Sequence, residues 1–542
     1  MGRIKTTVTK VNKRLPLQLA AGLLAGSTLL SGVLGLIRDR QINGLYLHTY
    51  QTGIDAYTVA FTIPDFMFFI LVSGALSVTF IPVFSQRLIS GNKRSAWELS
   101  TSLVNFMALI TLVASILIII FAEPLVHYVV GPGLDEASRA LAVSMMRVIA
   151  INPFLFAVAT VVASMQQAIG RFAFFALAPT VYNIGIIIGT LFFTNGITIF
   201  GWHVFEGGIM GVALGVVLGA ILQLIVSSIG LFGMGFDYQF KIFWKNKGFR
   251  RVLTLLPARS LDQGIDYVNS IVETNLASRL VAGSIRAYQQ ATTLSYVPIN
   301  LIGVAISTAA FPKMAERLGD GRPDLFKTEL QAVLRVIIWL ALPATVIAFF
   351  GRGYLVSFLV NGGDTVIASI FGILAIAILF RSIYHISARS FYAQQDTRTP
   401  LFVSIFTIGL NITLAIWFTI ILGLGVYGLA WATAIVSATE VAVLFFIMSK
   451  RIKGLFDLPF LGAIAKMTSA AGFMTIVTYI AVLTFPFNAS DQSLLATVPK
   501  FVLISLISGT AYFVMSYFMK LDEVHPVLYR LRKILFFRSR PQ

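Results

Sequence analysis

The sequence contains no cysteine and few charged residues. None of its 542 residues is Cys, and only 12% are Asp, Glu, Lys or Arg, about half the charged fraction of an ordinary soluble protein. Because thiols are absent, disulfides, thiolate metal sites and cysteine nucleophiles are excluded. The shortage of charge excludes a series of soluble domains, since too little polar surface would be left to solvate them.

Long apolar runs take the place of the missing charge. Hydrophobic residues make up 57% of the chain, and its mean hydropathy is +0.85. A helix that crosses a bilayer needs about 20 mostly apolar residues. The sequence therefore predicts an all-α polytopic membrane protein with fourteen transmembrane helices, near residues 16–37, 55–84, 98–122, 140–166, 174–194, 205–232, 249–278, 283–312, 330–350, 367–390, 400–422, 425–449, 464–485 and 499–519.

The charges that remain are mostly basic and unevenly placed. Lys and Arg number 41 against 23 acidic residues, which gives a net charge of +18. Roughly three-quarters of the basic residues fall in the two tails and the loops that follow even-numbered segments, the bias typical of the cytoplasmic side. We therefore expect both termini in the cytoplasm, an uncleaved first segment, and no nucleic-acid partner. The basic tail after Lys520 is either an amphipathic helix on the anionic leaflet or disordered.

Two sequence patterns occur twice. Residues 77–88 resemble residues 307–318, and Gln166-Gln167…Arg171 resembles Gln394-Gln395…Arg398. These matches align six segments with six others and leave the last two outside the repeat. Repeated halves are typical of secondary transporters, which bind substrate near the bilayer midplane between the repeats.

Several ionisable residues lie inside the predicted spans, where they are costly and usually mark a transport pathway. In segment 249–278, Asp262, Asp266 and Glu273 share one helix face, and Arg259 lies in the same segment. Arg381 and His385 share a face of segment 367–390. Cationic faces suit an anionic substrate, and the carboxylates suit a coupling Na⁺ or H⁺. The alternative is that these residues form interhelical pairs, or that those near span ends, such as Arg40, Arg279 and Arg389, extend to the interface.

Motifs for catalysis and for ATP use are missing. The chain has no Walker A, G-x-S-x-G or H-E-x-x-H motif, and no histidine is spaced for metal binding with His385. We therefore expect a transporter rather than an enzyme. It has no cofactor and no resident metal beyond a coupling ion such as Na⁺, and is driven by an ion gradient, the membrane potential or a partner.

Short motifs in a fixed order resemble those of one known family. They are Ser31-Gly-Val-Leu-Gly-Leu-Ile-Arg38-Asp39, Asp55-Ala56, Gly74-Ala-Leu-Ser77…Pro82, Gly131-Pro132-Gly133, and Phe391-Tyr392-Ala393…Asp396-Thr397-x-Thr399-Pro400. The chain resembles the MurJ/MviN lipid II flippase family of the multidrug/oligosaccharidyl-lipid/polysaccharide exporter superfamily. The likeness covers roughly residues 20–520.

The resemblance implies a V-shaped bundle around a cationic cavity. Its parts would be an N-lobe with helices 1–6 (1–240), a C-lobe with helices 7–12 (241–450), helices 13–14 with a groove for the lipid tail (451–520), and a basic cytoplasmic tail (521–542). The implied cargo is lipid II, the undecaprenyl-diphosphate-linked peptidoglycan precursor, moved by alternating access from the inner to the outer leaflet of the bacterial cytoplasmic membrane. Membrane lipids and the cell-wall synthesis machinery are the implied partners, and cell-wall biogenesis and cell shape the implied processes.

The charges that the family places in its cavity are only partly present. Arg38, Asp39 and Asp55 carry over, whereas Gly32, Phe68, Phe69 and Thr293 stand where relatives have charged residues. We expect the remaining substrate-binding cavity residues to be Arg259, Arg286, Arg381 and His385, and the ion-coupling residues to be Glu273, Asp396 and Asp266. The missing arginines leave open an alternative cargo, another polyprenyl-diphosphate-linked oligosaccharide of the O-antigen or teichuronic type.

Overall fold

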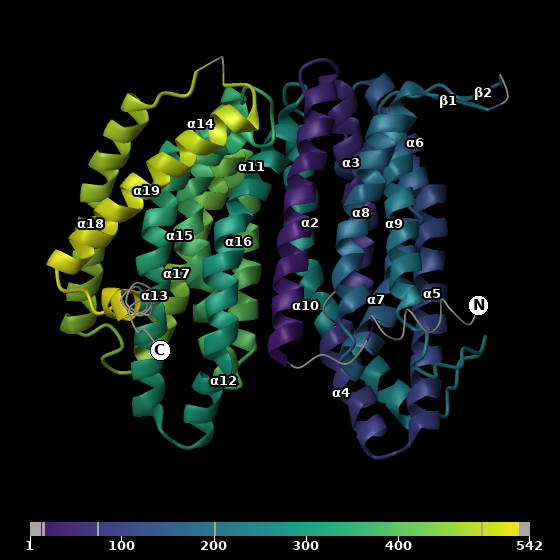
Figure 1. Ribbon diagram of the computed structural model, residues 1–542, viewed down its shortest axis with the longest axis horizontal. Coiled ribbons are helices and arrows are strands. Elements are labelled where there is room, and N and C mark those ends of the chain that lie inside the picture. The colour runs from purple at the N-terminus through teal and green to yellow at the C-terminus, as the bar shows by residue number, and fades with distance from the viewer. Residues whose placement is uncertain (1–11, 13–16, 73–74, 200–201, 489–490, 530–542) are drawn as a thin grey trace, which may run out of the picture. The chain divides into compact units, whose positions relative to one another are not determined.

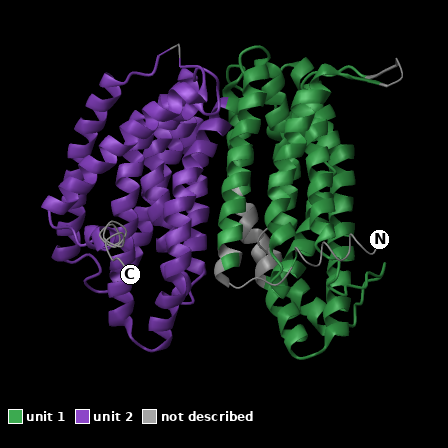
Figure 2. Ribbon diagram, in the orientation of Figure 1, with its two compact units in different colours: residues 1–286 green, residues 287–542 purple. Residues whose placement is uncertain are grey.

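The computed structural model describes residues 12, 17–72, 75–199, 202–488 and 491–529, without the side chains of 17, 18, 20, 21, 75–78, 199, 202–204 and 257–266. The chain forms two compact units, Met1–Arg286 and Ala287–Gln542, coloured separately in Figure 2. Both units are built from helices, as Figure 1 shows.

Unit 1 contains the helices from α2 to α10 and one small β-hairpin. Its elements are α2 (Leu17–Tyr46), α3 (Gln51–Leu71), α4 (Ala75–Ile89), α5 (Lys93–Pro124), the π-helical turn η1 (Leu125–Val130), α6 (Glu136–Ile149), α7 (Asn152–Ile169), α8 (Ala173–Phe192), the 3₁₀ turn η2 (Phe193–Asn195), β1 (Ile197–Ile199), β2 (Trp202–Phe205), α9 (Met210–Ile229) and α10 (Lys247–Ser278). β1 and β2 pair in antiparallel fashion.

Unit 2 contains helices joined by loops, with no strand among its described residues. Its elements are α11 (Ser284–Pro298), which begins in unit 1, η3 (Ile299–Val304), α12 (Ala305–Gly319), α13 (Pro323–Phe350), α14 (Arg352–Ser357), α15 (Thr365–Ala393), α16 (Arg398–Ile416), η4 (Trp417–Ile421), α17 (Val426–Arg451), α18 (Leu458–Thr484) and α19 (Leu494–Phe518). Residues 524–529 are helical, and the rest of the basic tail, 530–542, lies outside the described residues.

The prediction of an all-α polytopic membrane protein is confirmed. Within the described residues, twelve helical stretches are long and apolar enough to cross a bilayer. The first and seventh predicted spans form α2 and α10, which are long helices but are not among the twelve. Part of their side chains lies outside the description, so the count of fourteen spans stays a prediction.

Glycines bring α8 and α9 into close contact in unit 1. Gly185 and Gly189 of α8 face Gly215 and Gly219 of α9, and a Cβ added at Gly189 would lie 2.2 Å from the Cα of Gly215. Small residues four apart let membrane helices approach until their backbones touch. Any larger side chain at Gly189 would push these two helices apart.

The loops of unit 1 gather at two opposite ends. At one end, Asn246 before α10 donates to the carbonyl of Ser95 in α5 at 3.0 Å, and Arg171 before α8 donates to the carbonyl of Gly233 at 3.1 Å. The turn between α4 and α5 lies at this end, opposite the β1–β2 hairpin (Figure 1). The loops that follow even-numbered predicted segments of this unit thus lie at the same end. This is expected, because two successive crossings return the chain to the side from which it started.

The boundary between the units follows the seventh long helix. α10 packs against α3, α4 and η1 of unit 1, whereas the N-lobe implied by the family resemblance ends at residue 240, before that helix. The two boundaries differ because the first is defined by contacts between residues and the second by the resemblance of the sequence to a family. The lobe ranges 1–240, 241–450, 451–520 and 521–542 therefore stay predictions.

Candidate functional site

One buried carboxylate in unit 1 holds two arginines. Asp39, near the end of α2, accepts on Oδ1 from Nε and Nη2 of Arg38 at 3.2 and 3.1 Å. The same oxygen accepts from Nη2 of Arg286, in the first turn of α11, at 3.4 Å. Because buried charges are stable only when paired, Asp39 fixes both guanidinium groups. We call Arg38, Asp39, Asp55 and Arg286 the arginine cluster.

Asp55 of α3 completes this cluster through the backbone. Its Oδ1 accepts from the amide of Arg286 at 2.9 Å, and its Oδ2 accepts from the amide of Gly283 at 2.6 Å. These amides belong to the start of α11, where N–H groups have no partner in the helix, so Asp55 acts as a capping carboxylate from another helix. Arg286 is further held by its Nε, which donates to Oδ1 of Asn43 at 2.9 Å.

Arg38 differs from Arg286 in its access to the surroundings. The side chain of Arg38 is 25% exposed, whereas that of Arg286 is 4% exposed. Arg38 Nη1 donates to Oδ1 of Asn183 in α8 at 2.9 Å, and Asn183 Nδ2 donates in turn to Ser31 Oγ at 3.2 Å. Arg38 is thus the member of the cluster that can reach an incoming anion, and Arg286 supports it through Asp39.

The other predicted cations lie in unit 2 or outside the described side chains. Arg381 of α15 donates from Nε to Ser437 Oγ of α17 at 3.1 Å, and the His385 ring lies edge-on to Tyr384, with centroids 5.6 Å apart. Arg259 of α10 lies outside the described side chains. The structure therefore brings together four of the seven predicted binding residues, all in unit 1.

The three predicted ion-coupling residues fall in different places. Glu273 of α10, in unit 1, accepts from Asn269 Nδ2 at 2.9 Å, as expected for residues one helical turn apart. Asp396 belongs to unit 2. Asp266 lies outside the described side chains.

Asp396 lies in the turn before α16 and is tightly held. It accepts from the amide and hydroxyl of Thr399 at 3.0 and 2.6 Å and pairs with Nη2 of Arg451 at 2.7 Å. Burial alone would raise the pKa of this carboxyl, but the bonds from Thr399 and Arg451 lower the pKa to about 2. Asp396 is an ionised helix cap that ties α16 to α17.

Aromatic residues occupy two of the positions where the family resemblance led us to expect charges. The ring of Phe69 in α3 stacks on Tyr267 of α10, with centroids 4.2 Å apart and planes 22° apart. Phe68 meets Phe156 edge-on at 5.5 Å. At a third position, Gly32 of α2, a Cβ would have no atom within 4 Å. Phe68 and Phe69, where the resemblance implied charged residues, take part in aromatic packing instead. Gly32 has open space around it.

A buried carboxylate in unit 2 was not among the sequence candidates. Glu440 of α17 accepts from Ser404 Oγ and Thr407 Oγ1 of α16 at 3.1 and 3.2 Å and is 5% exposed. It is the one acidic residue of a 26-residue apolar helix, a signal that was available in the sequence. The supporting residues Asn43 and Asn183 had no comparable signal as partners of arginines.

Comparisons with known proteins agree with one another. A family model described as lipid II flippase MurJ matches residues 50–520. The probable lipid II flippase MurJ of Thermotoga maritima is 25% identical over 514 residues, which are 93% of this chain and 97% of that protein. The lipid II flippase MurJ of Burkholderia cenocepacia is 26% identical over 398 residues, 70% and 74% of the two chains.

Solved structures show the same fold. A lipid II flippase MurJ in an inward closed conformation superposes with a TM-score of 0.71 at 24% identity, over 91% of this chain and 98% of that one. An inward-facing multidrug resistance transporter of the MATE family, in the MOP superfamily, gives a TM-score of 0.65 at 14% identity, over 84% and 99%. At these identities the likeness concerns the fold alone.

Proposed function

Because the chain belongs to the lipid II flippase MurJ family, we propose that it moves lipid II from the inner to the outer leaflet of the bacterial cytoplasmic membrane. It is a multi-pass membrane protein, and its membership rests on a family model that covers most of the chain. The observation that carries the proposal is the arginine cluster. In it, Asp39 of α2 and Asn183 of α8 hold a partly exposed guanidinium at Arg38.

The chemistry of the cargo explains why such a group is needed. A diphosphate with an attached glycopeptide cannot cross hydrocarbon unaided, because its charges would lose their hydration. A guanidinium replaces part of that hydration with paired hydrogen bonds to phosphate oxygens. Arg38 supplies this contact in our proposal, and the polyprenyl tail stays in the lipid.

The rest of the cluster keeps Arg38 in place and in balance. Asp39 and Asp55 offset the charges of Arg38 and Arg286, so the cluster is neutral while empty. An anion that binds Arg38 competes with Asp39 for its N–H groups, and Arg286 is the neighbour that retains the carboxylate. Binding and release of the diphosphate would then exchange partners on Arg38 without leaving a charge unpaired.

We further propose that Arg259, Arg381 and His385 contribute to the path of the glycopeptide or diphosphate. Glu273, Asp266 and Asp396 are proposed to couple movement to an ion gradient or the membrane potential, and the chain has no enzymatic activity of its own. We place both termini in the cytoplasm on the strength of the basic-residue bias, and we expect cell-wall synthesis enzymes as partners. The alternative cargo is not favoured, because both relatives and the family model bear the lipid II name.

Transport by the purified protein tests this function. The chain is reconstituted into vesicles with fluorescent lipid II in the inner leaflet, and arrival at the outer leaflet is followed with a membrane-impermeant quencher. We expect transport of lipid II above that of empty vesicles. Equal transport of a polyprenyl-diphosphate O-antigen unit, or none of lipid II under an imposed gradient and potential, would overturn it.

A further inference from the structure

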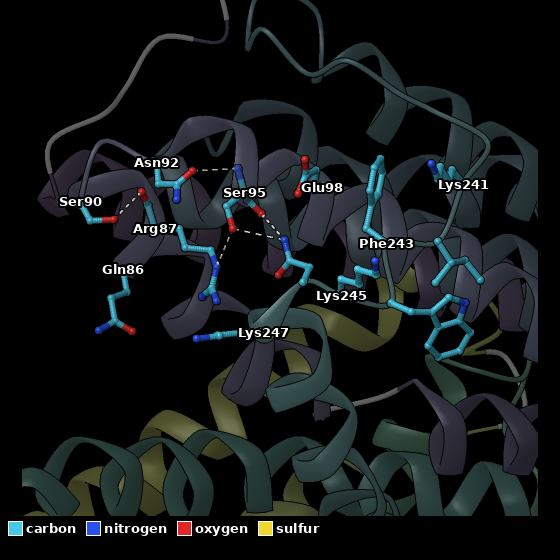
Figure 3. A pocket seen from close by; sticks show the side chains of 13 residues that line it. Gln86, Arg87, Ser90, Asn92, Ser95, Glu98, Lys241, Phe243, Lys245 and Lys247 are labelled. Carbon is cyan, nitrogen blue, oxygen red and sulfur yellow. Dashed lines mark hydrogen bonds between the residues drawn. The ribbon is translucent and has the colours of Figure 1, made fainter.

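A second basic region lies at the end of unit 1 that holds the turn between α4 and α5, away from the arginine cluster. We call it the loop-end cavity. It is a cavity of about 920 Å³ where α4, α5 and the segment before α10 meet (Figure 3). Its walls are formed by Gln86, Arg87, Ser90, Asn92, Ser95, Glu98 and residues 241–247.

The charge in this cavity is largely unbalanced. Four cations line it, Arg87, Lys241, Lys245 and Lys247, against the single carboxylate of Glu98. Glu98 is already paired with Nε of Arg94 at 3.1 Å. In the part of the chain that the structure describes, no carboxylate lies in ion-pair contact with any of the four cations. The cavity therefore presents excess positive charge.

Arg87 is fixed in the wall although no carboxylate among the described residues pairs with it. Its guanidinium donates to Ser95 Oγ at 3.3 Å and to the carbonyl of Val83 at 3.1 Å. A Cβ at Gly248 would lie 2.4 Å from its Cζ, so the start of α10 leaves room for the group. Burial lowers the pKa of Arg87, and the nearby charge of Arg251 lowers it further. A bound anion would oppose both effects, because it stabilises the charged form of Arg87.

The backbone beside Arg87 is ordered by one residue. Asn246 accepts on Oδ1 from the amides of Gly248 and Phe249 at 2.9 and 3.2 Å and donates to Ser95. It caps α10 and joins that helix to α5. The positive end of the α10 dipole therefore adds to the field of the cavity.

Exposed aromatic rings interleave with these cations. Phe240 is 93% exposed, Trp244 is 53% exposed and Tyr238 is 50% exposed, between and beside Lys241 and Lys245. A soluble anion gains nothing from such rings, whereas aromatic and basic side chains together are typical of the membrane–water interface. The loop lies between two predicted spans, where the polypeptide meets the headgroup layer.

We propose that this cavity binds the phosphate headgroup of an anionic glycerophospholipid, with Phe240 and Trp244 placed at the boundary between headgroups and acyl chains. The lipid is a resident ligand and not the cargo, so the inference is independent of the proposed transport. Basic pockets between helices on the cytoplasmic side are suited to such headgroups.

Lipid binding by the full-length protein tests the inference. The purified protein in a neutral detergent is titrated with phosphatidylglycerol or phosphatidylcholine, and bound lipid is counted by native mass spectrometry. We expect phosphatidylglycerol to bind at least tenfold more tightly than phosphatidylcholine. The double variant Arg87→Ala/Lys247→Ala should lose most of this preference, because each cation contributes about fivefold. The double variant Arg317→Ala/Arg322→Ala makes the same change in net charge at residues that do not line the cavity and should keep the preference.

A second measurement locates the lipid. Phosphatidylglycerol with brominated acyl chains should quench part of the tryptophan fluorescence, and that part should disappear in Trp244→Phe. Lys245→Ala, at an exposed position, gives a milder test if the double variant fails to fold. Equal binding of the two lipids, or equal loss in the control, would overturn the inference. Competition by inorganic phosphate or glycerol phosphate at the affinity of the lipid would assign the cavity to a soluble ligand instead.

Discussion

Unit 1 contains two basic regions, which differ in whether carboxylates pair with their cations. In the arginine cluster, each guanidinium is held by Asp39, and the more buried one, Arg286, is 4% exposed. In the loop-end cavity, Arg87 and three lysines share an open space with one carboxylate that is already paired. The carboxylates of the first region balance its cations, whereas the cations of the second region outnumber its carboxylates.

This difference shows that an arginine's role depends on its partners more than on its charge. A buried, paired guanidinium contributes structure, since removal of one partner leaves an uncompensated charge. A cation without a carboxylate partner contributes little to stability and is available to a ligand. Variants in the cluster should therefore change stability, and variants in the cavity should change lipid binding.

The largest expected effect is at Asp39. Asp39→Ala leaves two guanidinium groups without their shared carboxylate and should reduce the free energy of unfolding by about 3–5 kcal/mol. Thermal unfolding in detergent measures the loss. The combined change Asp39→Leu/Arg286→Met should recover part of it, because a buried pair can be replaced by apolar side chains. No loss in the single variant would remove the distinction between the two regions.

Asp55 should have the next largest effect. Asp55→Ala leaves the amides of Gly283 and Arg286 without acceptors, and we expect a loss of about 1–3 kcal/mol. Asp55→Asn keeps one acceptor oxygen and should lose less. Hydrogen exchange at the first turn of α11 should increase in proportion, and unchanged exchange would show that the cap does not hold this helix.

A charged pair in a loop of unit 2 provides an intermediate case. The pKa of Asp396 is lowered to about 2 from its ordinary value of 3.8, so its contribution to stability is complete above pH 4 and is lost as pH falls from about 4 to about 2. Unfolding temperatures measured across this range should fall less steeply in Asp396→Asn than in the wild type. Equal slopes would show that the turn does not depend on the ionised form.

The smallest stability effects should come from the loop-end cavity and from Gly32. Arg87→Ala removes no ion pair among the residues that the structure describes and should change stability by less than about 0.5 kcal/mol. Gly32→Arg introduces the charge that the family resemblance implies, at a position with open space around it. It should leave stability within about 1 kcal/mol and increase lipid II affinity, measured by titration. Loss of folding in either variant would contradict the geometry described above.

Much of the fold could be predicted from the sequence, but less of the site. Apolar length alone predicted the twelve helical stretches that are long and apolar enough to cross a bilayer, because a bilayer requires a helix of about 20 residues. Helical spacing accounts for the contact between Asn269 and Glu273, which are one turn apart. It could not place Arg286 against Asp39, since these residues are far apart in the sequence and meet only through the packing of α2, α3 and α11.

Accessibility was also beyond the sequence. Arg38 and Arg286 look alike as cations near span ends, and both were expected to face the substrate. The structure distinguishes them, because Arg286 donates to Asn43 and its side chain is 4% exposed, whereas the side chain of Arg38 is 25% exposed. The cation pattern of residues 241–251 was visible in the sequence, but its proximity to Arg87 depended on the fold.

The most direct test of the account is lipid II transport by Arg38 variants in reconstituted vesicles. Loss of a charged hydrogen-bonding group costs about 1.5–3 kcal/mol, so Arg38→Ala should transport roughly ten- to a hundredfold more slowly. Arg38→Lys should be intermediate, and the control Arg322→Ala should match the wild type. Transport at the wild-type rate by a folded Arg38→Ala protein would contradict the central claim that Arg38 binds the diphosphate.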